Sequence, residues 1–291
     1  MYRRVLVATG GSPWSYTAVT YAIALAAYTG AELHILTVLT SAVTSYTTPD
    51  VLSSSELLLD SLERQGQALL AQAADLAAEA GVQQVSWLKW GNVSETIMLT
   101  ATEEACDLIV LGARQVTGLK RLMVGGTSNA VAAKAQQPVL IVKQPSSSAP
   151  EVFFWQHVLV ATGGSPWSDV AVDYALDLAQ QHHLGVDILY VDSTRPQQRD
   201  ELRLATSEGK SILALAEARA IAAGVTFQTR MAYGNVAETI LDTAMRQQSD
   251  LIILGSRGLT GWKRLMLGSI SNAVAAKSTL PVLIVKRFLS K

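Results

Sequence analysis

An eleven-residue string occurs twice in the chain, and this repeat constrains the fold more than any other feature. VLVATGGSPWS occupies residues 5–15 and returns unchanged at residues 158–168. Three further segments recur in the same order: GNVSETI (91–97) as GNVAETI (234–240), DLIVLGAR (107–114) as DLIILGSR (250–257), and GLKRLMVGGTSNAVAAK (118–134) as GWKRLMLGSISNAVAAK (261–277). Both halves close on PVLIVK. The chain therefore contains two copies of one domain.

The length of 291 residues suits two domains of ordinary size. We expect a first copy at residues 1–143, a Pro/Ser-rich linker at 144–156, and a second copy at 157–291. The offset between the copies falls from 153 residues at the opening string to 143 in the later segments. The additional material in the first copy is the polar run 40–55, which we expect to be a loop.

Short apolar runs alternate with longer helical stretches in each copy. In the second copy the helical stretches begin near Pro166, Gln198, Asn235 and Ser269. Runs such as VLVA, LIIL and VLIV are apolar on both faces, as in the central strands of a parallel sheet. The sequence predicts an α/β fold with two tandem open five-stranded parallel sheets flanked by helices, of the Rossmann-like class. In such sheets a ligand lies beyond the carboxyl ends of the strands, where the strand order reverses.

The loop after the fourth strand of the second copy has the residue types that an anion site requires. It contains Gly255, Gly258 and Gly268, and Ser269 follows at the start of a helix. Glycines let backbone N–H groups approach an anion, and a helix N-terminus adds unpaired N–H donors. Ser269 either donates to a phosphate or caps the helix. Each glycine alone is more simply explained by a tight turn, whereas all of them in one loop favour nucleotide phosphate binding.

This loop, G-x2-G-x9-G-[ST], resembles the nucleotide loop of universal stress proteins of the ATP-binding kind. The VLVA-x-x-GS turn, the GNV-x-ETI segment, DLI-x-LG and the final PVLIVK strand also match, so the resemblance covers nearly the whole chain as two tandem copies. It implies a stress-response protein that binds ATP or another adenine nucleotide, with or without Mg²⁺. It carries cofactor binding onto these residues of the second copy: Ala161, Thr162, Gly163, Val191, Gly255, Arg257, Gly258, Gly268, Ser269 and Ile270.

The first copy departs from this pattern, so we expect its nucleotide loop to be degenerate. Gln115 replaces the second glycine, and Gly126 replaces the serine. Its weaker candidate residues are Thr9, Gly10, Val38, Gly112, Arg114, Gly125, Gly126 and Thr127. In both copies the opening turn also lacks the aspartate that many family members have there, which removes an acceptor for adenine or ribose.

The turn TGGSPWS has a second interpretation as a pyrophosphatase loop, S-G-G-x-D-S, of adenylating enzymes. Proline and tryptophan stand where that motif requires aspartate and serine. We therefore expect a structural turn at the border of the site, in which Ser12 and Ser165 cap helices. Pro13 and Pro166 then take the first helical position, where a missing N–H is harmless.

No catalytic constellation is evident in the sequence. The four histidines are scattered, and the lone Cys106 reads as a small buried hydrophobic residue. Three hypotheses remain: a nucleotide-binding regulatory protein, a slow ATPase or adenylate-transferring enzyme, and an interaction module that does not bind nucleotide. The first is favoured because the second-copy loop is intact while acid, base and pyrophosphatase residues are missing.

Charge and hydropathy limit the partners. The net charge of −1 argues against a nucleic-acid groove, and no apolar run reaches the roughly 18 residues of a membrane span. We expect a cytoplasmic protein without a membrane partner. The final apolar strands would leave exposed edges, and family members dimerise through this strand. We expect the final strands of the two copies to lie adjacent, as an intramolecular pseudo-dimer, and a homodimer of whole chains is also compatible with the sequence.

Overall fold

The computed structural model describes residues 2–40, 49–114, 126–143, 155–193, 199–256 and 268–286. Each copy alternates strands and helices. The elements of the first copy are β1 (Arg4–Ala8), α1 (Pro13–Thr29), β2 (Glu32–Leu39), α2 (Pro49–Glu79), β3 (Gln84–Trp90), α3 (Val93–Glu103), β4 (Leu108–Ala113), α4 (Gly126–Lys134) and β5 (Val139–Lys143). Those of the second copy are β6 (His157–Thr162), α5 (Pro166–His182), β7 (Gly185–Asp192), α6 (Arg199–Ala223), β8 (Phe227–Tyr233), α7 (Val236–Arg246), β9 (Leu251–Ser256), α8 (Ser269–Lys277) and β10 (Val282–Lys286).

The described residues form two compact units whose boundary differs from that of the repeat. The N-terminal unit contains Tyr2–Ala113, and the C-terminal unit contains Arg114–Lys143 together with the second copy. In the N-terminal unit the strand order is β3-β2-β1-β4, and all neighbours are parallel. In the C-terminal unit the order is β5-β10-β9-β6-β7-β8, and every pair except β5–β10 is parallel. The predicted α/β class with parallel sheets flanked by helices is confirmed.

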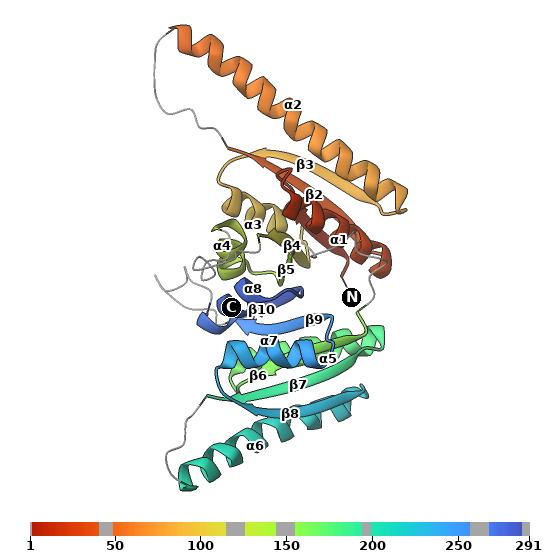
Figure 1. Ribbon diagram of the computed structural model, residues 1–291. Helices are drawn as coiled ribbons and strands as arrows, with labels where there is room; N and C mark the ends of the chain where they lie inside the picture. The colour runs from red at the N-terminus through yellow and green to blue at the C-terminus, as the bar shows by residue number, and fades with distance from the viewer. Residues whose placement is uncertain are drawn as a thin grey trace. The chain divides into compact units, whose positions relative to one another are not determined.

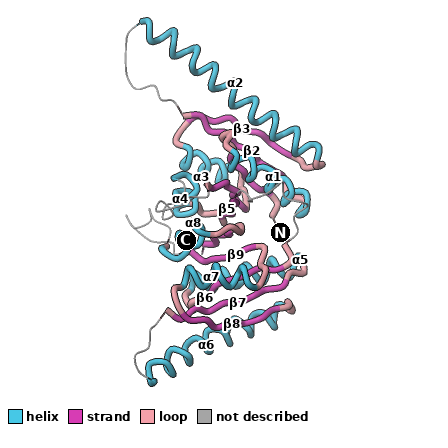
Figure 2. The backbone as a smooth tube through the Cα atoms, viewed as in Figure 1, coloured by secondary structure: helices cyan, strands magenta, loops and turns pink. Residues whose placement is uncertain are grey.

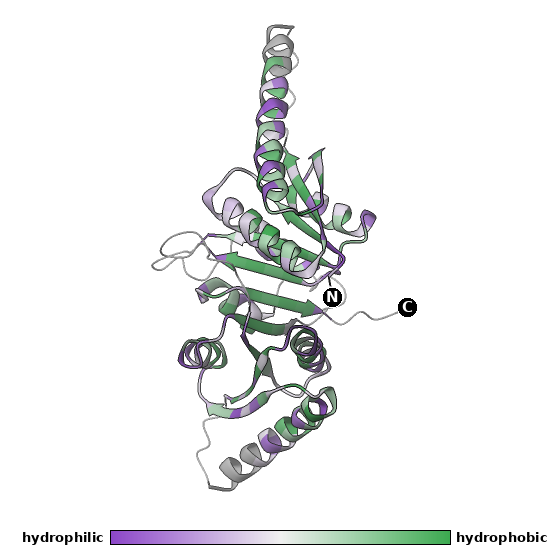
Figure 3. Cartoon of the chain, turned by 90° about the vertical axis from the view of Figure 1, so that its right-hand side faces the viewer, coloured by the Kyte–Doolittle hydropathy of each residue, from purple (hydrophilic) through white to green (hydrophobic). Residues whose placement is uncertain are grey.

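Apolar strands and amphipathic helices explain the layers of each unit. Residues Val5–Val7, Leu108–Val110 and Leu251–Ile253 are fully buried, because helices cover both faces of these central strands. In the C-terminal unit α5 packs with α6 and α7 packs with α8 (Figure 1; Figure 2). Figure 3 shows strands coloured as hydrophobic along most of their length, whereas α2 carries hydrophobic and hydrophilic residues together. Within the described ranges, no helix has the length and apolarity needed to cross a membrane.

The sequence suggested a loop over the whole polar run 40–55, and this expectation is wrong for its second part. Residues 41–48 lie outside the described part, but α2 begins at Pro49 and continues to Glu79. Proline is well suited to the first helical position, since its φ matches the helix and its missing N–H has no acceptor there. The serines that suggested a loop are therefore the first turns of a helix whose body is rich in Leu, Ala and Glu.

The expected adjacency of the final strands is confirmed. β5 and β10 pair in antiparallel register, with Leu283 opposite Leu140. Each strand ends in a buried lysine. The Lys286 Nζ donates to the Ala135 carbonyl at 2.7 Å, and the Lys143 Nζ donates to the Arg114 carbonyl at 3.4 Å. Burial lowers the pKa of both lysines from 10.5 to about 8.

These buried lysines predict that the protein becomes more stable as the pH rises from about 8 to 10.5. In that interval the unfolded chain keeps protons that the folded chain has released, so the free energy of unfolding increases with pH. Each lysine contributes on the order of 3 kcal/mol to the rise. Denaturant titrations of Lys286→Met across this interval should show about half of the wild-type rise. Lys277→Met, which removes an exposed ion pair with Glu238, should leave it unchanged. An unaltered rise in Lys286→Met would contradict the assignment.

Candidate functional site

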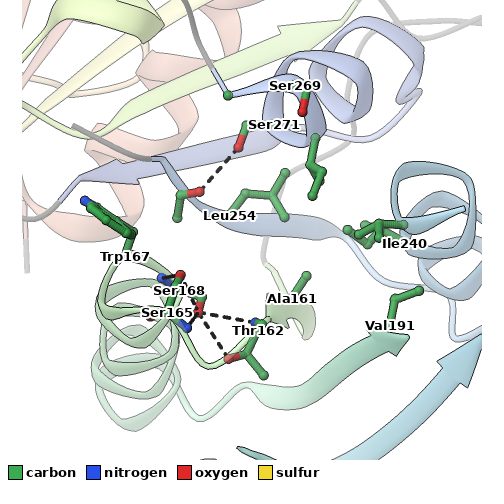
Figure 4. A pocket seen from close by; sticks show the side chains of 15 residues that line it. Ala161, Thr162, Ser165, Trp167, Ser168, Val191, Ile240, Leu254, Ser269 and Ser271 are labelled. Carbon is green, nitrogen blue, oxygen red and sulfur yellow. Dashed lines mark hydrogen bonds between the residues drawn. The ribbon is translucent and has the colours of Figure 1, made fainter. Parts of the chain in front are cut away.

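A pocket of about 460 Å³ opens at the carboxyl ends of β6, β7 and β9 in the C-terminal unit. β6 and β9 are neighbours there, and the chain continues from β6 toward β8 but from β9 toward β10. This is the reversal of strand order at which open α/β sheets bind ligands. The N-termini of α5, α7 and α8 complete the walls (Figure 4).

The repeated turn forms the wall next to α5. Ser165 is the N-cap of α5, and its side chain accepts from the Ser168 N–H at 3.3 Å. The Ser168 Oγ in turn accepts from the Gly163 N–H at 3.3 Å and from the Ser165 N–H at 3.0 Å. Pro166 takes the first helical position, as expected. One hydroxyl therefore holds the backbone of the turn that lines the pocket, and the expectation of a structural turn bordering the pocket is confirmed.

Gly255 lies where β9 passes beneath the first turn of α5. A Cβ on Gly255 would lie 2.6 Å from the Trp167 carbonyl carbon and 3.0 Å from the Ser168 N. These are backbone atoms, so no side chain can be added without displacing the start of α5. Gly255 lines the pocket, but its glycine identity is explained by the packing of the strand against the helix.

The start of α8 forms the opposite wall. Its N-cap is Gly268, which provides no side-chain hydrogen bond, and Ser269 is the first helical residue. The alternative that Ser269 caps this helix is therefore wrong. The first N–H groups of a helix have no acceptor within it, so the N–H groups of Ser269, Ile270 and Ser271 lack intrahelical partners. Together with the positive end of the helix dipole, they make this wall suitable for an anion.

The remaining wall is apolar. Val191 and Leu254 come from strand ends, and Val236 and Ile240 come from the first turns of α7. Asn235 caps α7, and its Oδ1 accepts from the Glu238 N–H at 3.2 Å. Figure 4 shows Val191 and Ile240 together on one side of the hollow, away from the serines of α5 and α8. The pocket thus pairs an apolar region with a region of N–H and hydroxyl donors.

Eight of the ten residues predicted for the second copy line this single pocket. They are Ala161, Thr162, Gly163, Val191, Gly255, Gly268, Ser269 and Ile270. Arg257 and Gly258 lie outside the described residues. Seven lining residues were not predicted: Ser165, Trp167, Ser168, Val236, Ile240, Leu254 and Ser271. All seven belong to the repeated segments, so the recurrence of whole segments rather than of single glycines was the signal that could have found them.

The candidate residues of the first copy fall in both compact units. Thr9, Gly10, Val38 and Gly112 belong to the N-terminal unit. Gly126 and Thr127 are the first residues of α4, in the C-terminal unit. Arg114 belongs to the same unit, and its carbonyl accepts from the Lys143 Nζ. Gly125 and Gln115 lie outside the described residues.

The titratable side chains on and beside the strands bind one another or are buried, and they do not line the pocket. His157 Nε2 lies 2.8 Å from Asp187 Oδ2, and Arg230 Nε donates to the same carboxylate at 3.0 Å. This cluster around the buried Asp187 lies toward the amino ends of β6 and β7, and none of its members lines the pocket. Burial raises the pKa of the Cys106 thiol to about 12, so this cysteine is inert. Among the described residues, no three His, Cys, Asp or Glu side chains are grouped so as to hold a metal ion.

Comparisons with known proteins agree across both copies. The model of the universal stress protein family matches residues 1–143 and 155–286. Universal stress protein YxiE of Bacillus subtilis is 38% identical over 144 residues, which are 44% of this chain and 97% of that protein. A universal stress protein of Mycolicibacterium smegmatis is 25% identical over 296 residues, covering 97% of this chain and 96% of the relative.

One of the similar solved structures supports the fold over the whole chain. The crystal structure of a universal stress protein from Archaeoglobus fulgidus is 21% identical with a TM-score of 0.75, and the match covers 99% of this chain and 97% of that one. A universal stress protein crystallised in complex with cAMP is 31% identical over 45% of this chain and 97% of its own, with a TM-score of 0.39. That protein binds an adenine nucleotide.

Proposed function

The chain belongs to the universal stress protein family, with two family domains in tandem, and we propose that it is an adenine-nucleotide-binding regulatory protein of the stress response. The proposed site is the pocket of the second copy, and the proposed ligand is ATP. Nucleotide occupancy would set the conformation or assembly of the chain. Mg²⁺, a cytoplasmic location and a homodimer stay predictions.

One observation carries this proposal: the pocket has an apolar end and an uncapped helix N-terminus in the same hollow. A purine base requires apolar contacts on its faces, and Val191, Val236 and Ile240 supply such contacts. A phosphate chain requires N–H and hydroxyl donors, which the start of α8 and Ser269 supply. The volume of about 460 Å³ is within the range of small-molecule sites.

A binding role is preferred to a catalytic one because of what lines the pocket. Its described lining consists of Gly, Ala, Val, Ile, Leu, Trp, Ser and Thr, and contains no carboxylate, histidine, lysine or cysteine. General acid or base chemistry requires such a group within hydrogen-bonding distance of the reacting atoms. The described lining can bind and orient a nucleotide, and its donors can stabilise phosphate charge.

Native mass spectrometry of the freshly purified chain, followed by mass analysis of the denatured extract, tests the proposal. We expect an adenine nucleotide bound to the chain, with the triphosphate recovered intact. Recovery of ADP alone, with turnover of added ATP, would favour the slow ATPase. If no nucleotide is present and added ATP with Mg²⁺ does not bind, the chain is an interaction module. The same spectra report whether whole chains pair.

A further inference from the structure

The outer face of α6 is apolar, although this helix lies at the surface of the C-terminal unit. α6 packs on β7, β8 and α5, and Figure 1 shows it at the edge of the unit, beside β8. Leu215 and Ile221 keep 66% and 65% of their surface exposed, and Ala214, Ala218 and Ala222 are exposed beside them. These five residues stand at i, i+1, i+4, i+7 and i+8, so they share one face of the helix.

The packing of α6 inside its own unit does not use this face. The residues that α6 buries against the sheet are Gly209, Leu213, Ala216 and Ala220, which lie on the opposite side of the helix. α6 therefore has two apolar faces. A helix of a globular protein normally needs only the one that faces the core, so the second apolar face indicates a further contact.

The helix α2 of the first copy shows that the fold does not require an apolar outer face. Gly66 of α2 corresponds to Gly209 of α6, since a Cβ would lie 2.6 Å from Leu88 in the first case and 2.8 Å from the aligned Met231 in the second. The outer face of α2 is nevertheless polar. At the exposed positions of Leu215, Ala218 and Ala222 it carries Gln72, Asp75 and Glu79. The apolar outer face is thus a property of the second copy alone.

Two opposite charges flank one side of this face. Lys210 and Glu217 are exposed and stand seven residues apart, which places them two turns apart on the same side of the helix. Neither makes an ion pair with another residue of the described part of the chain. If two such helices paired in parallel and in register, each charge would face its own copy. In an antiparallel pair, Lys210 of each chain can face Glu217 of the other.

The other side of the face carries a second pair with the same centre. Glu208 and Arg219 are placed symmetrically about the point between Leu213 and Ala214, as Lys210 and Glu217 are. Arg219 binds Asp169 and Asp173 of α5 at 3.4 Å each, and 39% of its side chain stays exposed. One twofold axis at this point would therefore bring opposite charges together on both sides of the apolar face.

We propose that two copies of the chain pair through the outer faces of α6, antiparallel, with a twofold axis beside Ala214. Leu215 and Ile221 are then covered by the second chain, and Lys210 and Glu217 form reciprocal ion pairs across the interface. Such an interface uses the same surface on both chains, so assembly through it stops at two. An interface made by one helix pair is small, so we expect a reversible dimer with a Kd in the micromolar range.

Sedimentation velocity of the full-length chain over a concentration series tests the apolar part of the interface. The variant Leu215→Gln/Ile221→Ala gives α6 the residues that α2 has at the aligned positions, and both sites are exposed, so the fold is kept. We expect its dimer Kd to rise by at least about tenfold. The control is Met245→Thr on α7, which removes a side chain of equal exposure, 68%, and should leave the Kd unchanged. Thermal melts report whether each variant is folded.

Charge reversal tests the partner and the register. Lys210→Glu and Glu217→Lys should each raise the dimer Kd by about tenfold, since each turns two attractive pairs into two repulsive ones. The double variant Lys210→Glu/Glu217→Lys should recover the wild-type Kd. An equimolar mixture of the two single variants should form heterodimers, which native mass spectrometry resolves by mass. Damage to the fold would not be recovered by a second substitution.

A cysteine placed near the proposed axis tests the antiparallel arrangement. Ala214→Cys should form a disulfide-linked dimer on mild oxidation, because the two copies of this position lie beside the axis. Ala222→Cys should not cross-link, since an antiparallel pair would hold its two copies roughly 25 Å apart. The native Cys106 is buried and does not compete.

Every other result overturns the proposal or one of its parts. A wild type that stays monomeric over the whole concentration series leaves α6 to a different partner and refutes the pairing. A dimer that is unchanged in Leu215→Gln/Ile221→Ala has its interface elsewhere. Equal cross-linking of Ala214→Cys and Ala222→Cys, or no recovery in the double charge variant, would refute the antiparallel register. The nucleotide content of the same samples tests the proposed function separately, because the pairing does not depend on it.

Discussion

Gly255→Ala is expected to lower the free energy of unfolding by about 3 kcal/mol or more, although it adds a single methyl group. The new Cβ would lie 2.6 Å from the Trp167 carbonyl carbon and 3.0 Å from the Ser168 N. Overpacking against side chains commonly costs 1–3 kcal/mol, and here the neighbours are backbone atoms that cannot rotate away. Differential scanning calorimetry should show a fall in Tm of roughly 6 °C or more.

The matched control for this change is Gly163→Ala, in the same pocket. Within the described ranges no atom lies within 4 Å of a Cβ at that position, so its Tm should change by less than about 2 °C. Gly112→Ala should reproduce the Gly255→Ala loss in the N-terminal unit, because its Cβ would lie 2.9 Å from the Ser15 N. Equal melting temperatures for Gly255→Ala and Gly163→Ala would show that the strand does not press on the helix.

Gly268→Val is expected to weaken ATP binding at the second copy by about 100-fold, which is about 2.7 kcal/mol. The branched side chain would occupy the space in front of the first N–H groups of α8, where the phosphate is proposed to lie. Among the described residues no atom lies within 4 Å of a Cβ at Gly268, so we expect the chain to stay folded, with a loss of about 1 kcal/mol for replacing an N-cap glycine. Titration calorimetry with ATP and with adenosine measures both effects.

Adenosine distinguishes a phosphate effect from general damage to the pocket. Its affinity should fall by less than about tenfold in Gly268→Val, since the apolar end of the pocket is untouched. Gly126→Val, at the start of α4, also meets no atom of the described part of the chain within 4 Å of its Cβ and should leave the ATP site of the second copy intact. Equal losses for ATP and adenosine would argue against phosphate binding at α8.

The fold could be predicted from the sequence because short local patterns specify its strands and helix caps, and these patterns occur in both copies. Apolar runs such as Val5–Val7 and Leu251–Ile253 are buried on both faces, and caps such as Ser165 and Asn235 occur in both copies. A strand or helix predicted in one copy can be tested against the aligned segment of the other copy. The error at residues 49–55 arose where this check was missing, since the additional segment of the first copy has no counterpart in the second.

The walls of the pocket were harder to predict than its glycines. Val236 and Ile240 look like ordinary core residues of an amphipathic helix, and only the approach of α7 to the strand ends brings them to the pocket. The packing role of Gly255 depends on the path of α5, which sequence spacing does not contain. The capping role of Ser269 could not be decided either, because a serine at the start of a helix is equally suited to the N-cap and to the first helical position.

The pairing of β5 with β10 bears on how such a chain can diverge and how it can be cut. The last strand of each copy is buried against the last strand of the other copy. A substitution in one PVLIVK segment must therefore still pack against the other PVLIVK segment. If the chain were cut within residues 144–154 and the two fragments were then separated, each fragment would carry an uncovered apolar strand. The sequence repeats as two equal copies, whereas the burial of each closing strand depends on the other copy.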